Sequence, residues 1–405
     1  MDGDIVIPKS GYPPLMDRSG FMRHNAPAEG TRGHTIRNDR MGISMPVRSR
    51  HSQMRITKTT VARCMLALWL GPMALTCVGA ANGQAADEAR QPVAIQFSYD
   101  RPLESSMAPF VVAQDHGLFS AEGLAVGTNI ANGSPEAIAR VASGASDLAM
   151  VDINELIRFR DQANVPPVKA VFVLFNESPY AFVARKSRGI RALSDLEGKT
   201  VGVADSDFSI RMWPALAREN GIKIANVKLN RISAAVREPI LSAGQLDAVA
   251  GFSYLAAVNL RDRGVPASDL TVLRYADYGC EAYGFAVIVN PALAAAKPEA
   301  IKGFVRAVIA GTHLTIKDPE RAVDEVVSRM DGGTRDLELE RLAAVVSDNI
   351  LTGEVKRNGL GGVDPARLER SIDQIGEEHK FRKRPAAADI FDDSFLPPVA
   401  GRLMN

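Results

Sequence analysis

The sequence has 405 residues, of which 46% are hydrophobic, 23% charged and 6% aromatic, and its formal net charge is +1. This composition fits a globular protein and excludes a coiled coil, a collagen-like fibre and a mostly disordered chain. The first 85 residues hold 11 of the 48 basic and 5 of the 47 acidic residues, which leaves 37 basic and 42 acidic residues from Ala86 onward. Nucleic-acid binding needs a basic face, so we expect no nucleic acid among the partners.

Residues 54–85 have the pattern of a secretory signal peptide. A basic start, MRITKTTVAR, precedes a short apolar segment, CMLALWLGPMALTCVGA, and small residues then lead to a polar, acidic ADEAR. This order is typical of an export signal and predicts a periplasmic protein, with cleavage after Ala80 or Ala85. A retained membrane anchor and a lipoprotein at Cys77 are the alternatives, but the apolar segment is short and interrupted by a glycine and a proline.

Residues 1–53 show no hydrophobic periodicity and are rich in Gly, Pro, Arg and Met. A signal peptide begins near its own initiator, so we expect translation to start at Met54 or Met45 and the upstream stretch to be over-annotated. A disordered extension is the alternative. After removal of the signal only Cys280 remains, which leaves no intramolecular disulfide, metal cluster or CxxC site, and we expect no cofactor and no metal.

From Val93 onward the pattern alternates between short apolar strands and helices. The first set of strands is predicted at 93–99, 124–130, 147–151, 169–175 and 180–186, with helices at 106–119, from 134 onward and at 152–162. At the start of the second of these helices, Ser134 has the position of an N-cap, with a proline in the first turn and an acid after it.

A second set begins at 195. Its strands are predicted at 195–204, 226–230, 247–251 and 270–276, and its helices at 208–220, 233–244 and 253–263. A return strand at 283–290 follows, and beyond it the pattern is helical to about 380.

Alternating strands and helices predict parallel sheets that are covered on both faces. Two such sets predict an α/β protein of two lobes, with a hinged cleft at the carboxyl ends of the strands. The predicted boundaries are 86–182 for the first part of lobe one, 183–283 for lobe two, 284–380 for the return strand and C-terminal helices of lobe one, and 381–405 for an irregular tail.

Four phrases carry a family resemblance. They are MAPFVVAQDHGLFSAEGLAV, GSPEAIARVASGASDLAMVD, LSDLEGKTVGV and KPEAIKGFVRAVIAGTHLTIKDPERAV, and in this order they cover most of 93–330. Together they resemble the periplasmic substrate-binding proteins of ABC importers, in the group that binds sulfonates, taurine, nitrate and thiamine-pyrimidine precursors.

The resemblance implies a type II periplasmic-binding fold and a monomeric exported receptor without reaction chemistry. Such a receptor captures a small-molecule ligand and delivers it to an ABC permease in the inner membrane. We expect a nitrogen-containing ligand similar to a thiamine-pyrimidine precursor, with sulfonate, taurine or nitrate as the alternative. A periplasmic sensor, and a pyrimidine-precursor or menaquinone-pathway enzyme on the same fold, are alternatives of other classes.

Candidate ligand-binding residues are those that follow the strand ends. Tyr99 with Asp100 resembles the aromatic–acid pair of pyrimidine-precursor binders, the alternative being a turn Asp beside a packed Tyr. Ser134 either binds a polar oxygen at a helix N-terminus or only caps the helix. The candidates of lobe one are Tyr99, Asp100, Ser105, Gly133, Ser134, Asp152, Asn154, Asn176 and Ser178.

In lobe two, Asp205 and Asp207 stand where many relatives have a Gly/Ser-rich, anion-binding loop. Two carboxylates there would repel a sulfonate or nitrate, which favours an amine-bearing or heteroaromatic ligand. The alternative is that most of the candidates are hinge and rim residues. The candidates of lobe two and the return segment are Asp205, Asp207, Ser209, Phe252, Tyr254, Glu281 and Tyr283.

Enzyme signatures are weak. Ser253 follows a strand and precedes a helix like the serine of a nucleophile elbow, but the final Gly of that motif is Leu255. The histidines beyond the signal, at 116, 313 and 379, are too far apart in sequence to suggest a metal site. Trp213 lies within a predicted helix and is expected in the core.

Overall fold

The computed structural model describes residues 91–205 and 207–404, which belong to one compact unit of the chain, Gln84–Asn405. The predicted N-terminal extension and signal peptide, with its cleavage sites and Cys77, lie outside the described residues. Among the described residues, none of the helices has both the length and the hydropathy that a membrane span needs.

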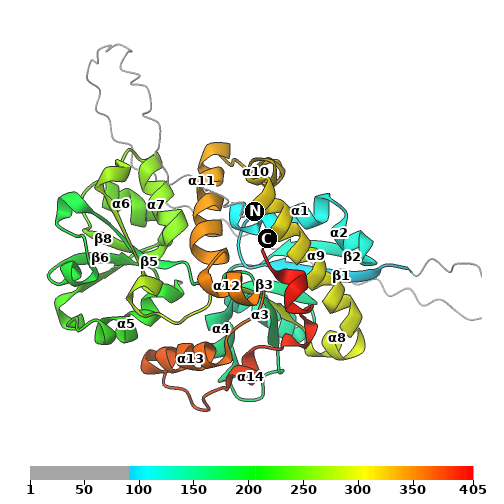
Figure 1. Ribbon diagram of the computed structural model, residues 1–405. Helices are drawn as coiled ribbons and strands as arrows, with labels where there is room; N and C mark the ends of the chain where they lie inside the picture. The colour runs from blue at the N-terminus through cyan, green and yellow to red at the C-terminus, as the bar shows by residue number, and fades with distance from the viewer. Residues whose placement is uncertain (1–90, 206, 405) are drawn as a thin grey trace, which may run out of the picture. The chain divides into compact units, whose positions relative to one another are not determined.

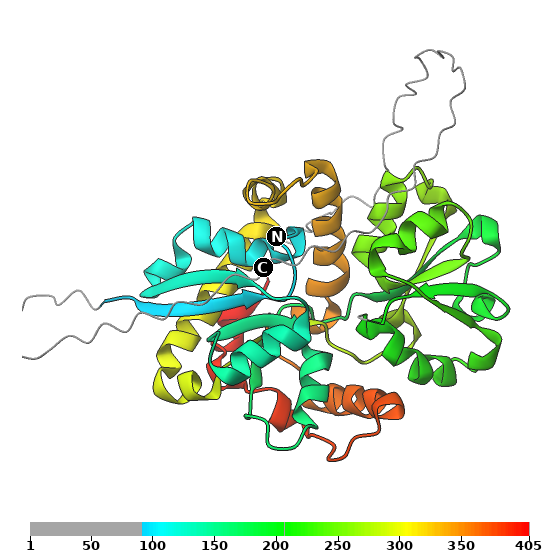
Figure 2. The ribbon, with the colours of Figure 1, turned by 180° about the vertical axis from the view of Figure 1, so that it is seen from behind.

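Two five-stranded sheets form the two lobes (Figures 1 and 2). The sheet of lobe one has the order β2 (Leu124–Ile130), β1 (Val93–Tyr99), β3 (Leu148–Asp152), β10 (Phe285–Val289) and β4 (Lys169–Val173). The sheet of lobe two has the order β7 (Lys228–Arg231), β6 (Thr200–Val203), β8 (Ala248–Phe252), β5 (Tyr180–Arg185) and β9 (Leu270–Arg274). The predicted two-lobed α/β fold is confirmed.

The prediction of all-parallel sheets is wrong, because each sheet contains one antiparallel strand. β10 runs antiparallel to β3 and β4, and β5 runs antiparallel to β8 and β9. Both strands follow a crossing from the other lobe. The crossing enters beside the carboxyl ends of β3 and β8, so the strand that follows it must run in the opposite direction. The predicted lobe boundary at 182 and 183 falls within β5.

A Gly-x-x-Asp motif precedes a central strand in each lobe, and its aspartate aligns that strand with its neighbour. The Asp147 carboxylate accepts a bond from the backbone N–H of Gln96 in β1 at 2.7 Å, and the Asp247 carboxylate accepts one from Thr200 in β6 at 2.9 Å. In each lobe a glycine with positive φ ends a helix three residues before the aspartate. The G-x-x-D phrase therefore ends a helix and aligns two neighbouring strands.

Glycine and proline shorten several of the predicted helices. The helix predicted at 106–119 is divided at Gly117, whose φ is 68°, into α1 (Ala108–Asp115) and α2 (Leu118–Ala121). The helix predicted at 208–220 begins as a 3₁₀ turn, η4 (Phe208–Met212), before α5. The remaining helices of the two lobes before β10 are α3 (Ser134–Ser143), α4 (Ile153–Arg160), α5 (Trp213–Glu219), α6 (Arg237–Ser242) and α7 (Ser253–Asp262).

The chain after β10 is mostly helical, as predicted. Its helices are α8 (Pro291–Ala296), α9 (Pro298–Lys317), α10 (Pro319–Val327), α11 (Arg335–Val345), α12 (Gly353–Asn358), α13 (Pro365–His379) and α14 (Ala387–Ile390). Proline stands in the first turn of four of them, where its missing N–H costs no hydrogen bond. The tail predicted at 381–405 contains α14 and is tied to lobe one, where Asp392 N–H donates to Ala170 O at 2.9 Å.

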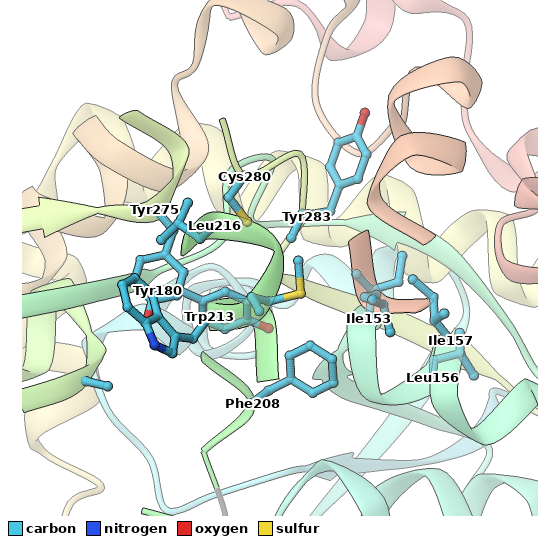
Figure 3. Packing of buried hydrophobic residues seen from close by; sticks show 14 of the residues in the cluster. Ile153, Leu156, Ile157, Tyr180, Phe208, Trp213, Leu216, Tyr275, Cys280 and Tyr283 are labelled. Atoms are coloured by element: carbon cyan, nitrogen blue, oxygen red, sulfur yellow. The ribbon is translucent and has the colours of Figure 1, made fainter. Parts of the chain in front are cut away.

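The largest hydrophobic cluster contains residues of both lobes (Figure 3). Ile153 and Leu156 of α4 belong to it together with Phe208, Trp213 and Leu216 of lobe two. Trp213 is 1% exposed and packs edge-to-face on a phenylalanine of β5, as expected of a core residue. The two lobes therefore share an apolar contact on the side of α4.

The crossing of α1 and α9 depends on Gly311. A Cβ atom at this position would lie 2.2 Å from the backbone oxygen of Pro109. Gly311→Ala should therefore push the helices apart and lower the free energy of unfolding by about 1–3 kcal/mol, measured by urea denaturation.

Gly303→Ala in the same helix is the matched control, because the atoms nearest to its Cβ would be side-chain atoms of Glu122 and Arg306, at 3.2 Å or more, rather than backbone atoms. Better helix propensity should keep that variant within about 1 kcal/mol of the wild type. Equal losses in both variants would contradict a close crossing at Gly311.

Candidate functional site

Polar and aromatic residues of both lobes meet at the carboxyl ends of the parallel strands. We call this set the interlobe cluster. Its members from lobe one follow β1, end β3 or begin α3 and β10, and its members from lobe two begin β5, end β8 or lie in the first turn of α7. They are Asp100, Arg101, Glu104, Ser134, Asp152, Tyr180, Phe252, Tyr254 and Phe285.

Asp100 is the centre of the polar contacts on lobe one. Its carboxylate accepts two hydrogen bonds from the Arg101 guanidinium, Nε to Oδ1 at 2.9 Å and Nη2 to Oδ2 at 2.8 Å. It also accepts the Ser134 hydroxyl at 2.5 Å. Asp100 is 2% exposed, so its charge depends on these partners rather than on water.

The structure corrects the predicted N-cap. α3 is capped by Gly133, whose φ of 94° suits glycine, and the Ser134 side chain makes no capping bond. Instead the Ser134 hydroxyl donates to Asp100 and accepts the backbone N–H of Asp152 at 3.0 Å. Ser134 thereby connects the ends of β1 and β3.

Two aromatic rings from different lobes form a corner beside Asp100. The Phe252 and Phe285 ring planes are 85° apart, with centroids at 5.6 Å. The Arg101 Cζ atom lies 4.1 Å from the Phe285 centroid and 4.9 Å from the Phe252 centroid. We call these two rings the aromatic corner.

A hydrogen bond between Tyr254 and Glu104 also connects the two lobes. The Tyr254 hydroxyl of α7 donates to Glu104 Oε1 at 2.7 Å, and the Ser106 hydroxyl donates to the same oxygen at 2.7 Å. Burial, with the neighbouring Glu104 carboxylate, raises the pKa of the Tyr254 phenol well above its usual range. The phenol therefore stays protonated and remains a donor across the interface.

Asp152 forms a buried network at the base of the cluster. Its Oδ2 accepts the Tyr180 hydroxyl at 2.5 Å, and its Oδ1 accepts the Asn154 side-chain amide at 2.8 Å. That amide also donates to the Tyr283 carbonyl at 2.7 Å. Asn154 thus ties α4 to the end of β3 and to the segment that leads into β10, and its own Oδ1 has no partner.

The predicted Tyr99–Asp100 pair is separated by the alternation of β1. Tyr99 and Phe97 point to the same face of the strand, where Tyr99 packs edge-to-face on Phe97 and Phe110 and lines a cavity of lobe one. Asp100 lies with the interlobe cluster. Ser105 is fully buried, its N–H donates to Glu338 at 2.9 Å, and its hydroxyl has no partner.

The two acids of lobe two have separate surroundings. The Asp205 side chain is 73% exposed and pairs with Arg231 at the surface. Asp207 is largely buried, pairs with Arg237 at 2.7 Å and caps η4 by accepting the Ser209 N–H. Each carboxylate therefore has its own arginine, and the expected pair of free carboxylates is not present. The Ser209 hydroxyl is buried without a partner.

Four other candidates lie in the crossing segments, 174–179 and 279–284, and are held by the C-terminal helices. The Tyr283 hydroxyl donates to Glu354 at 2.9 Å, while the Arg367 guanidinium lies 4.1 Å from the Tyr283 ring centroid. Asn176 accepts from the Thr352 hydroxyl at 2.6 Å, and Glu281 pairs with Arg370 at 3.0 Å. Ser178 is buried in the first crossing, where its N–H donates to Ala282 O. We call this set the hinge clamp.

Four members of the interlobe cluster, Arg101, Glu104, Tyr180 and Phe285, were not predicted from the sequence. The signal for Arg101 and Glu104 was their place in the loop after β1, directly beside Asp100. Phe285 reads as one of five consecutive apolar residues of a buried strand, and nothing in that pattern distinguishes it. Arg237 was missed for another reason, since it opens α6 seven residues beyond the end of the strand predicted at 226–230.

The enzyme signature at Ser253 has no supporting geometry. The Ser253 hydroxyl is buried without a hydrogen-bond partner. His116 bonds Glu325 and His379 bonds Asp161, each on the outer helices of lobe one. Within residues 91–205 and 207–404, no group of three or more His, Cys, Asp and Glu side chains could hold a metal ion.

The Asp152 carboxyl predicts a specific pH dependence. Burial raises its pKa from 3.8 to about 7, against the opposing effect of the Tyr180 bond. The folded protein therefore holds a proton that the unfolded chain releases, so stability should fall as pH rises from about 4 to about 7 and then level off. Asp152→Asn should remove this loss, on the order of 4 kcal/mol, in denaturant titrations across that range.

Tyr180→Phe is the companion variant. Without the Tyr180 hydroxyl the carboxylate loses a donor, so the pKa of Asp152 should rise and the loss of stability should extend to higher pH. A wild-type and an Asp152→Asn protein with the same pH profile would contradict the raised pKa.

Comparison with known proteins gives a family. A family model described as NMT1/THI5 like matches residues 104–322. The riboflavin-binding protein RibY of Chloroflexus aurantiacus is 30% identical over 332 residues, covering 78% of this chain and 90% of the relative. A formylaminopyrimidine-binding protein of Halalkalibacterium halodurans is 24% identical over 313 residues, covering 76% and 91%. A 4-amino-5-hydroxymethyl-2-methylpyrimidine phosphate synthase of Legionella pneumophila is 27% identical over 216 residues, covering 53% and 67%.

Solved structures agree on the fold. The alkanesulfonate-binding protein SsuA of Xanthomonas axonopodis, bound to MOPS, has a TM-score of 0.56 at 15% identity and covers 75% of this chain and 99% of that one. The periplasmic aliphatic sulphonate-binding protein SsuA of Escherichia coli has a TM-score of 0.57 at 15% identity and covers 72% and 95%. Such identities show the fold alone, which is the periplasmic-binding-protein fold. The family match and the near-full-length relative show that the chain belongs to the NMT1/THI5-like family.

Proposed function

We propose that the protein is an exported solute-binding receptor of an ABC importer. It binds a small nitrogen-containing heteroaromatic ligand at the interlobe cluster and delivers it to a permease in the inner membrane. The observation that carries the ligand class is the aromatic corner with Asp100 and Glu104 beside it. Rings offer a stacking surface to a planar heterocycle, and carboxylates accept its N–H groups.

The extent of the family match supports a receptor rather than an enzyme. The two relatives named as binding proteins match over 90% and 91% of their own length, whereas the Legionella synthase matches over 67%. A receptor needs only positioned contacts and a hinge. The hinge clamp and the two crossing segments provide the elements that such a closure requires.

A purely anionic ligand fits the interlobe cluster less well. Arg101 follows β1 and Arg237 donates to the Ala250 carbonyl of β8, and each is already paired with a carboxylate, Asp100 and Asp207. A sulfonate bound there would have to separate one of these pairs and leave a buried carboxylate without its partner. A heterocycle that displaces Arg101 instead supplies N–H donors to Asp100, so the buried carboxylate does not stay unpaired.

A binding screen tests the proposed ligand class. The purified protein is heated with riboflavin, 4-amino-5-hydroxymethyl-2-methylpyrimidine, taurine, an alkanesulfonate or nitrate, and its melting temperature is measured. A heterocycle at a hundred times its dissociation constant should stabilise the fold by about 2.7 kcal/mol, which raises the melting temperature, while the anions should leave it unchanged. Stabilisation by sulfonate or nitrate alone would contradict the ligand class and leave the receptor role standing.

Two aspartates that follow strand ends, one buried and one exposed, provide a matched test of where the ligand binds. Asp100→Asn removes a buried carboxylate of the interlobe cluster and should weaken heterocycle binding about tenfold or more, since hydrogen bonds to charged groups contribute about 1.5–3 kcal/mol. Asp205→Asn changes an exposed carboxylate and should leave the affinity unchanged. Titration calorimetry measures both, and a larger effect at Asp205 would place the ligand elsewhere.

A further inference from the structure

The Arg101 guanidinium is held in the way that a bound ligand would be held. It makes two parallel hydrogen bonds to Asp100, and its Nη1 lies 4.0 Å from Glu104 Oε1. Its Cζ atom lies within 5 Å of both rings of the aromatic corner. A planar cation thus has one carboxylate bound through both oxygens, a second carboxylate at 4.0 Å and two aromatic rings around it.

Protonated aminopyrimidines, amidines and guanidines have the same recognition edge. Each has a planar N–C–N group with two adjacent N–H donors, which matches the two oxygens of a carboxylate in a fork-to-fork arrangement. Each also has a π-face or a delocalised charge that favours an aromatic ring. We infer, on the basis of the proposed function, that Arg101 occupies the amidine subsite of the interlobe cluster and competes with the ligand for it.

The contacts of Arg101 leave it free to exchange. Both of its carboxylate partners, Asp100 and Glu104, belong to the same loop after β1 as Arg101 itself. Among the described residues, its ion pairs are therefore all within lobe one. On the side of lobe two it contacts the face of Phe252 and interacts electrostatically with Tyr254. The Arg101 side chain is 20% exposed, and Phe252 is only partly buried, so solvent reaches this side of the subsite.

If Arg101 competes with the ligand, removal of its side chain should increase the affinity for the ligand. A ligand that binds only when Arg101 has left has an apparent dissociation constant equal to its intrinsic value divided by the population of the open subsite. If the open subsite is populated at about one tenth, removal of the side chain should tighten binding about tenfold. An arginine that contacts the ligand directly would give the opposite result.

The test is chemical rescue of Arg101→Ala. This variant leaves two carboxylates and two rings without their cation, so millimolar guanidinium or acetamidinium chloride should raise its melting temperature relative to the same concentration of sodium chloride. Neither ion should do so in the wild type. The variant should also bind 4-aminopyrimidine about tenfold more tightly than the wild type, measured by titration calorimetry.

Arg335→Ala is the matched control. Arg335 also bonds two carboxylates, those of Asp324 and Glu320, but the structure gives it no aromatic partner and it lies at the surface. Guanidinium should not stabilise this variant. Equal rescue of both variants would mean that any arginine between carboxylates behaves in this way and would overturn the inference.

The remaining outcomes separate the inference from the proposed function. Rescue by guanidinium without binding of any heterocycle supports the subsite and contradicts the proposed ligand class. Weaker heterocycle binding by Arg101→Ala overturns the competition, because Arg101 then contacts the ligand. If Arg101→Ala does not fold even with guanidinium, Arg101→Lys decides, since its ammonium keeps the charge and loses the planar fork. Tighter heterocycle binding by that variant supports the inference, and unchanged or weaker binding overturns it.

Discussion

Both segments that join the two sheets enter at the carboxyl ends of the parallel strands, and the rest of the structure depends on this constraint. It makes β5 and β10 antiparallel, each beside the strand that ends at the interlobe cluster. Tyr180 and Phe285, which begin these strands, are therefore placed directly at the cluster. The constraint also places two crossing segments outside both sheets, where the carbonyls of these largely buried segments need other partners. The hinge clamp supplies them through Arg367, which donates to the carbonyls of Glu281 and Ala282. The fold of the C-terminal helices is thus inseparable from the position of the site.

Apolar packing and ion pairs contribute unequally to the association of the lobes. Arg261 pairs with Glu340 between α7 and α11, and Arg218 pairs with Glu377 between α5 and α13 (Figures 1 and 2). Exposed pairs of this kind contribute about 0–1 kcal/mol each. In the shared cluster Ile153 and Trp213 are at most 1% exposed, and full burial of a large apolar side chain contributes about 1.5–3 kcal/mol. Opening of the lobes therefore requires the exposure of apolar surface, which a ligand bound at the interlobe cluster would oppose further.

The fold was predictable from the sequence because alternation and short connections determine which segments become strands and helices. Strand direction was not, since Phe285–Val289 has the same apolar pattern in either direction. The separation of Tyr99 from Asp100 could have been predicted from the sequence. Side chains alternate along a strand, so Phe97 and Tyr99 lie on one face and Asp100 on the other. The exposure of Asp205 could not have been predicted, because it depends on Arg231, which lies 26 residues away in the neighbouring strand β7. The role of Ser134 depended likewise on the non-local ends of β1 and β3.

The charges of the site illustrate why a count of acidic residues misjudged it. Asp100, Asp205 and Asp207 follow strand ends and suggest a negative surface, yet each is paired with an arginine, respectively Arg101, Arg231 and Arg237. Asp205 and Asp207 lie outside the interlobe cluster, where the Arg101 guanidinium faces the carboxylates of both Asp100 and Glu104. Selection among ligands then depends on exchange, because a cation competes with an arginine for a carboxylate and an anion competes with a carboxylate for an arginine. At Asp100 the competing arginine lies on the aromatic corner, and a planar cation alone among these ligands can replace both its hydrogen bonds and its ring contacts.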